Sequence, residues 1–572
     1  MLFHSNGLRR IAVLVGASAL TMTGLVAAAA PTQAQTAPDR AVSAASTWLT
    51  SQLTNGIVHN NEYNFDDLGL SADIAFALDA VGGHDSTVTL IVDAIERDTE
   101  SWVGGFSAGR VYAGSLAKMV SVVEAAEQDP RAYGGANQVV RLEGLVSTTA
   151  PRIGRLEDAG VDPTDPFDAD FVNVIGQSFA ARALTSAGSN RAVDATSFFL
   201  KQQCSDGFFR ASLTQDKTAA DQGCNPAIDT PSVDTTALAV INILDTPQAA
   251  TAAKGAAYLA ASWLKTQQAA DGSFSAGELG ANSNTTGLAG WALAAAGQEV
   301  AATRAAGWLR GLQVADLAPC AVTLSADNGA IAYKPADLTA ARTAGSFSVP
   351  IRETVRRASA QALPALAQLP AGGDVTVSAP ATAVEQSTVT ITLEGLGAGE
   401  PACVSFGGQS KKVTGTGSGV GVAFGLPAGA ATHTFRVTTL TGSATANTSA
   451  TAFPVTTAPP VSPVVGELVV ARVEKVKNNA FKLTVSCDST VTCAGKLKVR
   501  SARKVELANG DVRKLLIAKK EYSVAAGKTA AVRLTLQRPA RKVLGAKRLR
   551  VVATQTGRGA EPASTAFWLR RK

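Results

Sequence analysis

Acidic and amide side chains recur at the starts of Ala-rich segments in the first two thirds of the chain. The four clearest segments begin with Asp67, Asn173, Asp234, and the pair Asn282 and Asn284. At the start of a helix, Asp or Asn accepts a hydrogen bond from a free first-turn amide, so we expect these side chains to cap helices. If the helices stand side by side around a cavity, the caps and positive helix ends also form a polar rim, above a funnel of Ala and Leu, that could hold a ligand.

The same carboxylates raise the question of acid–base catalysis. A glycosidase needs two separated acids in one cleft, and Asp67, Asp234 and Asp327 are candidates, beside the acidic pairs at 66–67 and 168–170. We expect these carboxylates to be helix caps or solvated side chains, because most of the acidic residues of the chain lie in this region. The sequence contains no Cys-x-x-Cys, and it has only four histidines. We therefore expect no catalytic residues, no metal and no cofactor.

The Ala-rich segments with polar first residues belong to a repeat of two helices. An amphipathic segment that ends in Gln and a Gly turn precedes most Ala-rich segments, and its best copy is "WLKTQQAADGSFSAG" at 263–277. We expect Gln267 to hydrogen-bond across this turn and Phe274 to wedge the hairpin onto its neighbour. The half-polar helix should lie outside, and the Ala-rich helix inside, where small residues allow close approach.

Six such hairpins over residues 39–370 form either an open array or a closed ring. No strongly polar terminal repeat caps the array, which favours closure. We predict a multidomain chain that begins with an all-α (α/α)6 toroid at 35–370.

The Gln…Asp-Gly-Ser-Phe turn at 267–274 resembles the repeat of the squalene-cyclase and protein-prenyltransferase family, whose fold is an (α/α)6 toroid. The stretches "DNGAIAY" and "ASAQALPALAQLP" are similar to a narrower group of secreted bacterial surface proteins, in which Ig-like modules follow the toroid. The resemblance covers 39–370 well and the β-modules loosely. The resemblance implies an (α/α)6 toroid and export of the protein.

The chemistry of that family is not matched residue by residue. Terpene cyclases use an Asp-x-Asp-Asp motif, which neither "FDDL" (65–68) nor "DADF" (168–171) completes, and an aromatic cavity, whereas aromatics make up 5% of this chain. Prenyltransferases hold zinc through Asp, Cys and His, yet no histidine lies between His84 and His433. The thioester string of complement-like toroids is missing, and nothing marks a corrin site as in vitamin-B12 carriers. We expect Trp291, within a clear inner copy, to pack in the core.

Beyond residue 370, short Val-, Thr- and Phe-rich segments alternate with Gly turns. They predict an Ig-like β-sandwich at 371–455, a Pro-rich linker at 456–466 and a second all-β Ig-like domain at 467–572. Residues 466–572 hold 25 Lys+Arg and 7 Asp+Glu, hence +18, which leaves −12 for the rest of a chain of net charge +6. We expect this domain to bind an anionic wall polymer, although solubility alone is the alternative. The proposed contacts are Arg538, Arg541, Lys542, Lys547, Arg548 and Arg550.

The N-terminus predicts export. Arg9 and Arg10 precede an apolar run that ends near Ala34, as in a signal peptide spanning 1–34, and no later stretch could span a bilayer. An even number of cysteines in an exported chain favours disulfides, with Cys204–Cys224 and Cys487–Cys493 as local pairs. Cys320 and Cys403 either join two domains or stay free.

Together these features favour a secreted cell-surface protein without catalysis. Its toroid would bind a small-molecule, glycan or protein ligand, and its basic domain would associate with an anionic cell wall. Nucleic acid is a poor partner for an exported chain. The alternatives are a toroid enzyme, either an isoprenoid cyclase or lyase or a glycan-active enzyme, and a cobalamin-type carrier.

Overall fold

The computed structural model describes residues 39–104, 109–162, 165, 168–451, 466–489, 491–544, 548–556 and 562–572. The chain separates into two compact units between residues 452 and 453. The predicted signal peptide and nearly all of the predicted linker lie outside the described residues. No helix in the described part of the chain combines the length and the apolar character that a bilayer crossing needs.

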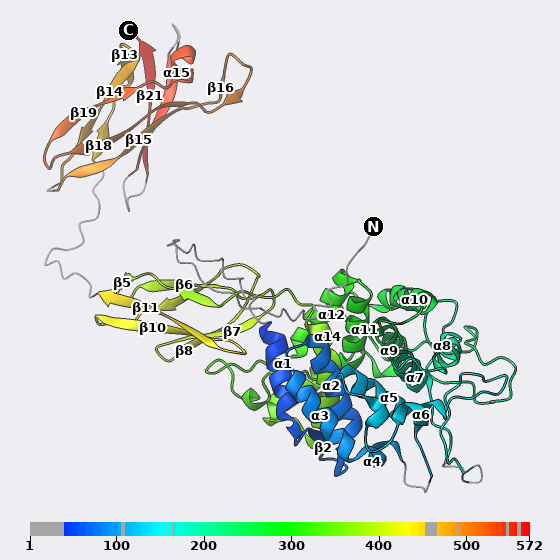
Figure 1. Cartoon of the computed structure of the whole chain (residues 1–572). Helices are drawn as coiled ribbons and strands as arrows, with labels where there is room; N and C mark the ends of the chain where they lie inside the picture. Colours follow the sequence, from blue (N-terminus) through cyan, green and yellow to red (C-terminus); the bar gives the residue numbers. More distant parts are fainter. Residues whose placement is uncertain are drawn as a thin grey trace, which may run out of the picture. The chain divides into compact units, whose positions relative to one another are not determined.

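Twelve helices of the described residues in the first unit form two layers (Figure 1). The inner layer comprises α2 (Leu68–Val81), α5 (Ala113–Ala125), α7 (Val174–Ser186), α9 (Val233–Leu244), α11 (Ser283–Ala295) and α14 (Val349–Leu366). Each inner helix packs on the next, and α14 returns to α2, so this layer is a closed ring. The outer layer comprises α1 (Arg40–Ser51), α3 (Asp85–Arg97), α6 (Gln138–Glu143), α8 (Ala192–Leu200), α10 (Thr251–Gln267) and α12 (Glu299–Leu312). The predicted (α/α)6 toroid is confirmed.

Shorter elements fill the connections between the layers. They are β1 (Leu53–Thr54), β2 (Ile57–Asn60), β3 (Phe65–Asp67), α4 (Thr99–Val103), η1 (Pro130–Ala132), η2 (Gly277–Leu279), η3 (Ser325–Asp327) and α13 (Pro335–Ala344). The strands β1, β2 and β3 form a small antiparallel sheet that leads from α1 into α2.

Small residues allow the inner helices to approach closely. A Cβ atom added to Gly287 of α11 would lie 2.5 Å from the Cα atom of Ala362 in α14. The helices α5 and α7 meet in the same way through Gly114 and Gly176, where an added Cβ would lie 3.1–3.5 Å from the facing Cα atom. The Ala- and Gly-rich composition of these segments is therefore a packing requirement, because any side chain here separates the helices.

A Gln side chain joins each of three outer helices to the next. The Nε2 atom of Gln203 donates to the carbonyl oxygens of Gly207 and Ala256, both at 2.9 Å. In the next hairpin Gln268 donates to Gly272 at 3.1 Å and to Ala301 at 2.8 Å. The prediction of Gln267 for this role was wrong by one residue, because Gln267 still belongs to α10 and its amide bonds only Thr266. Phe274 is fully buried, as predicted.

The third copy of this contact closes the toroid. Gln313, just after α12, donates to the carbonyl oxygen of Ala41 in α1 at 2.8 Å. Gly329, which has a φ of 100°, lies so close to α1 that an added Cβ would overlap the carbonyl oxygen of Ala44. The last outer helix thus meets the first through the same geometry that joins α10 to α12.

Polar caps begin most inner helices. Asp67 accepts from the amide of Leu70 at 2.8 Å, Asn173 from Gly176 at 3.0 Å and Asn282 from Thr285 at 2.8 Å, as predicted. Ser232 caps α9 instead of Asp234, which lies inside the first turn. Asn284 also lies within its helix, because Asn282 is the cap of α11.

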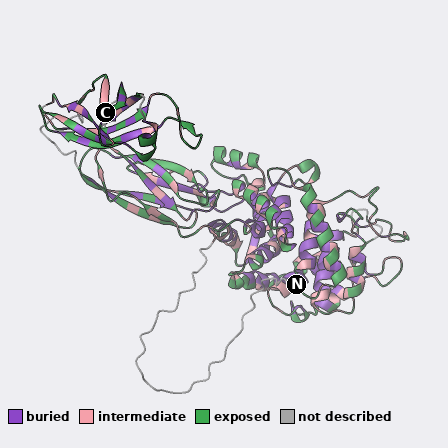
Figure 2. Cartoon of the chain, turned by 90° about the horizontal axis from the view of Figure 1, so that it is seen from above, coloured by how far each residue is buried: buried purple, intermediate pink, exposed green. Residues whose placement is uncertain are grey.

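A β-sandwich completes the first unit. One sheet has the order β5-β11-β10-β7-β8 and the other β4-β6-β9. Buried and exposed residues alternate along its strands (Figure 2). The strands are β4 (Thr376–Ser378), β5 (Thr382–Val384), β6 (Thr388–Glu394), β7 (Pro401–Phe406), β8 (Gln409–Thr414), β9 (Val420–Gly425), β10 (Ala431–Thr438) and β11 (Ser443–Thr451). Phe406, Phe424 and Phe435 pack together in its core.

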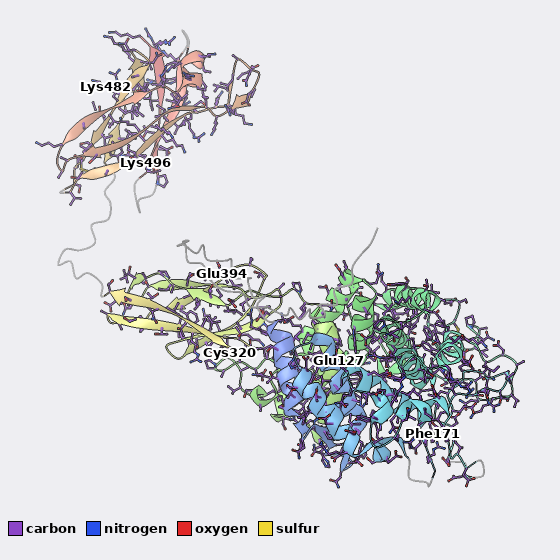
Figure 3. All side chains as sticks on the ribbon, in the orientation of Figure 1. Glu127, Phe171, Cys320, Glu394, Lys482 and Lys496 are labelled. Atoms are coloured by element: carbon purple, nitrogen blue, oxygen red, sulfur yellow. A yellow bond between two sulfur atoms is a disulfide. The ribbon has the colours of Figure 1, made fainter. Side chains whose placement is uncertain are left out.

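The toroid and this sandwich are joined by covalent and ionic contacts. Cys320 forms a disulfide with Cys403, which resolves the alternative left open by the sequence (Figure 3). Arg40, at the start of α1, forms a buried ion pair with Glu400 and donates to the carbonyl oxygen of Gly373 at 2.9 Å. The Cys204–Cys224 bond lies within the toroid.

The second unit is a separate β-domain with its own core. Its larger sheets have the orders β13-β21-β20-β15-β18 and β12-β14-β19, and the Cys487–Cys493 bond is present. Its elements are β12 (Glu467–Val469), β13 (Val473–Val476), β14 (Ala480–Ser486), β15 (Cys493–Ser501), β16 (Val505–Glu506), β17 (Val512–Arg513), β18 (Leu516–Val524), β19 (Thr529–Thr535), α15 (Arg538–Val543), β20 (Leu549–Thr556) and β21 (Ala563–Arg571).

Ring closure at Gly329 can be tested by two Gly→Ala substitutions. Gly329→Ala should lower the free energy of unfolding by about 2–4 kcal/mol, since the added Cβ is strained and overlaps α1. Gly307→Ala, in the middle of α12 with no described atom within 4 Å of the new Cβ, is the matched control. It should raise stability by up to about 1 kcal/mol, the difference in helix propensity. Equal shifts of the two urea midpoints would contradict the proposed role of Gly329.

Candidate functional site

The ring of inner helices encloses a cavity of about 600 Å³, the size range of small-molecule sites. All six inner helices contribute to its wall, through Asp73, Lys118, Phe179, Ile241, Trp291 and Arg357 among others. The N-terminal ends of α2, α5 and α7 form one side of its mouth, represented by Gly69, Gly114 and Asn173. The cavity is therefore a product of closure, because no single hairpin provides more than a small part of its wall.

Aromatic rings cover much of this wall, which the composition did not suggest. The rings are Phe76, Trp102, Tyr112, Phe171, Phe179 and Trp291. Phe76 stacks on Phe179 with centroids 5.9 Å apart, and Tyr112 faces Phe171 at 6.3 Å. The expectation of an Ala/Leu funnel was incomplete, because Trp102, Tyr112 and Phe171 come from connections outside the repeats. Trp291 packs against the core as predicted, and it also lines the cavity.

A chain of alternating charges crosses one side of the cavity. The Nζ atom of Lys118 lies 2.5 Å from Oδ1 of Asp73, and Nη1 of Arg357 lies 3.5 Å from Oδ2 of the same carboxylate. Nη2 of Arg357 also lies 2.8 Å from Oδ2 of Asp67, the helix cap. Each carboxylate therefore faces at least one cation.

Arg182 stands deeper in the same cavity. Its guanidinium carbon lies 5.2 Å from the ring centroid of Phe76, and Nη2 lies 2.5 Å from Oδ2 of Asp245. Burial raises the pKa of the nearby Glu124 to about 8, an effect that the positive charge of Arg182 only partly offsets. The cavity thus has an aromatic body and cations at two levels, Lys118 with Arg357 near the mouth and Arg182 below.

A second cavity of about 410 Å³ adjoins the mouth, and Arg357 lines both. Three of the five predicted rim residues, namely Asp67, Asp234 and Asn284, meet in its wall. Asn173 lines the central cavity instead. Asn282 is fully buried beneath the rim, where it serves as a cap.

Asp234 differs from the other acids of this mouth cavity. Asp67 is paired with Arg357, and Glu353 with Arg356 at 2.9 Å. The Oδ1 atom of Asp234 is buried and has no hydrogen-bond partner among the described residues, and burial raises the pKa of this carboxyl. Burial therefore disfavours the ionised form of Asp234.

Asp327 lies outside both cavities. Its carboxylate accepts from Nη1 of Arg352 at 2.7 Å and from Nε1 of Trp48 at 3.2 Å, so it joins η3 to α14 and α1. This structural role corrects the prediction of Asp327 as a candidate cleft acid.

Among the described residues, one group has the spacing of metal ligands, namely Cys204, Cys224 and Asp229. The two cysteines form a disulfide and offer no thiolate to a metal.

The predicted basic cluster is divided between two elements of the second unit. Arg538, Arg541 and Lys542 lie on α15, whereas Arg550 belongs to β20 and Arg548 directly precedes it. All five are exposed, and Lys547 lies outside the described residues. Arg550 faces Trp568 of the neighbouring strand rather than α15.

No protein-family model and no curated protein matches the sequence. Among solved structures, the chain is similar to a type II terpene cyclase from Scytonema, at 14% identity and a TM-score of 0.39 over 57% of this chain and 96% of that one. It is also similar to an unsaturated glucuronyl hydrolase specific for heparin, at 10% identity and a TM-score of 0.39 over 57% and 95%. The chicken CNTN1 FN1–FN3 domains are similar at 14% identity and a TM-score of 0.20 over 35% and 69%. Similarities at these scores carry no inference about activity.

The buried carboxyl of Asp234 should make the stability of the folded chain depend on pH. Burial raises the folded-state pKa above the unfolded value of about 3.9, so ionisation destabilises the folded chain as the pH rises through this interval. Asp234→Asn, neutral at every pH, should therefore raise the melting temperature at pH 7, with a gain that shrinks toward pH 4. Asp206→Asn, at an exposed turn, is the control. A gain for Asp234→Asn that is independent of pH would contradict the argument.

Proposed function

We propose that the protein is an exported, non-catalytic binding protein whose toroid captures a small ligand in the central cavity. The observation that carries this proposal is the combination of aromatic walls with fully paired charges at the mouth of the cavity. The aromatic wall gives a ligand apolar surface to cover, and the fixed charges select its polar end. Three disulfides are compatible with export.

The ion pairs argue against cyclase-type chemistry at this level of the cavity. A carboxyl that protonates an alkene must hold its proton, which requires an apolar site without a nearby cation. Asp73 does not meet this requirement, because the ammonium group of Lys118 lies 2.5 Å from its carboxylate. Ligand binding requires no proton donor and is compatible with the ion pair of Asp73 and Lys118.

The lining supports one ligand class above others. A molecule with a ring or isoprenoid body would cover Phe76, Phe179 and Trp291, and an anionic group would meet Lys118 and Arg357 or, at greater depth, Arg182. The basic second unit would hold the protein on an anionic cell-wall polymer, the partner that its charge of +18 favours.

One observation supports a second candidate function, acid catalysis on a glycan at the mouth cavity. Asp234 is a buried acid with a raised pKa in a cavity open to polar ligands. For this candidate, incubation with uronate-containing oligosaccharides should yield shorter products, and Asp234→Asn should abolish them. Intact oligosaccharides with the unsubstituted protein would exclude it for this substrate.

The binding proposal is tested by filling the central cavity. Leu238→Trp adds volume at the wall, whereas Leu90→Trp makes the same change on the exposed side of α3. The full chain is incubated with an extract of lipids and glycans, and bound compounds are identified by native mass spectrometry. Leu238→Trp should reduce the captured amount by roughly tenfold or more, and Leu90→Trp should leave it unchanged. Equal capture by the two variants would contradict the proposed site, and circular dichroism confirms folding of both.

A further inference from the structure

One sheet face of the second unit carries positive charge in an ordered pattern. In the sheet β13-β21-β20-β15-β18, the residues Leu497, Val499, Val551, Phe567 and Leu569 point into the core and are buried. Strand alternation turns their neighbours outward, and the outward cations are Lys475, Lys496, Lys498, Arg500, Lys519, Arg550 and Arg570, all exposed. On the described part of this face, Glu521 is the one opposing acid, and it is paired with Lys496 at 2.7 Å.

Like charges stand directly opposite each other on this face. Lys498 of β15 is the register partner of Lys519 of β18, and Lys475 of β13 is that of Arg570 of β21. Directly opposed like charges destabilise a sheet. The sheet would be more stable without them, so their arrangement suits an external anion that lies between the opposed side chains.

An exposed aromatic ring interrupts the row of cations. Trp568 of β21 is 36% exposed and lies between Val473 on one side and Arg550 on the other. The guanidinium carbon of Arg550 lies 6.0 Å from the ring centroid. An exposed indole with a neighbouring cation can cover the apolar side of a sugar ring while the cation binds an acidic substituent.

The face also has a hollow with hydroxyl groups. A shallow pocket of about 430 Å³ lies over β15, β18 and β20, and its wall includes Lys496, Lys498, Lys519, Thr554 and Thr556. Lysine ammonium groups and threonine hydroxyls provide donors for carboxylates and for sugar hydroxyls. Figure 3 labels Lys496 on this sheet and Lys482 on the other sheet of the domain.

We infer that the outer face of this five-stranded sheet binds an anionic polysaccharide, which crosses the sheet from the Lys498–Lys519 pair to Trp568 and the Lys475–Arg570 pair. The inference rests on the proposed attachment to an anionic polymer, and it assigns that attachment to the sheet face instead of α15. Outward side chains repeat at about 6.6–6.8 Å along a strand and at about 4.8 Å between strands. A chain of charged sugar units therefore meets several cations at once, each contact weak and sensitive to salt.

A polysaccharide fits this face better than nucleic acid. Single-stranded nucleic acid is held on several aromatic rings that stack successive bases. The described part of this face exposes one large ring, Trp568, among seven cations and several hydroxyls.

The test compares two double variants of the full chain that each remove two charges. Lys498→Gln/Lys519→Gln changes the sheet face, and Arg538→Gln/Lys542→Gln changes α15. Binding to polygalacturonate is measured at low and moderate salt, with neutral dextran and single-stranded DNA as comparison polymers. We expect the sheet variant to lose affinity by about tenfold at low salt and the α15 variant to stay within about twofold. The sheet variant should also melt at a higher temperature than the unsubstituted protein, because the like-charge pair is gone.

Trp568→Ala tests whether the sheet face recognises the sugar rings of the polymer or only its charge. It should weaken binding of polygalacturonate while leaving the steepness of its salt dependence unchanged, since no charge is lost. A loss confined to the α15 variant would overturn the sheet assignment and leave polymer attachment intact. No binding by the unsubstituted protein would overturn both. Equal or tighter binding of DNA with the same dependence on Trp568, or equal binding of dextran, would overturn the proposed ligand class.

Discussion

The contact between the turn that follows α12 and the first helix, α1, closes the toroid into a ring. Gln313 reaches the carbonyl oxygen of Ala41, and Gly329 lets the turn lie directly on α1. These groups repeat the contacts of Gln268 and Gly272 with α12, so the ring closes by continuing its own repeat. An open array of the same hairpins would expose apolar ends and leave the central cavity without part of its wall.

Closure also decides where charge can be tolerated. Each inner helix is packed on both sides, so a charge in its sequence needs an ionic partner from a neighbouring element. Asp73, Lys118 and Arg357 come from three different helices and meet in this way. Arg357 links the central cavity to the mouth cavity because it pairs with both Asp73 and the cap Asp67. The polar rim and the aromatic body are thus one continuous site.

The repeated elements were predictable from sequence because each depends on local chemistry. Caps such as Asn173, the Gly turns and the local cysteine pair at 487 and 493 follow from short spacings. Assignments that depend on register to within one or two residues were missed, as Gln267 and Asp234 illustrate. The aromatic wall was missed because Tyr112 and Phe171 lie in irregular connections with no period. Charged residues within the buried segments, such as Lys118, were the available signal for the cavity.

The two β-domains allow the role of surface charge to be separated from the needs of the fold. Both are two-layered, with a parallel strand pair beside antiparallel ones. Residues 371–451 hold three Lys+Arg and four Asp+Glu, a net charge of −1, whereas residues 466–572 carry +18. A sandwich of this kind therefore folds without a strong charge of one sign. The cations of the second unit, some of them directly opposed, are better explained by what they bind than by what they stabilise.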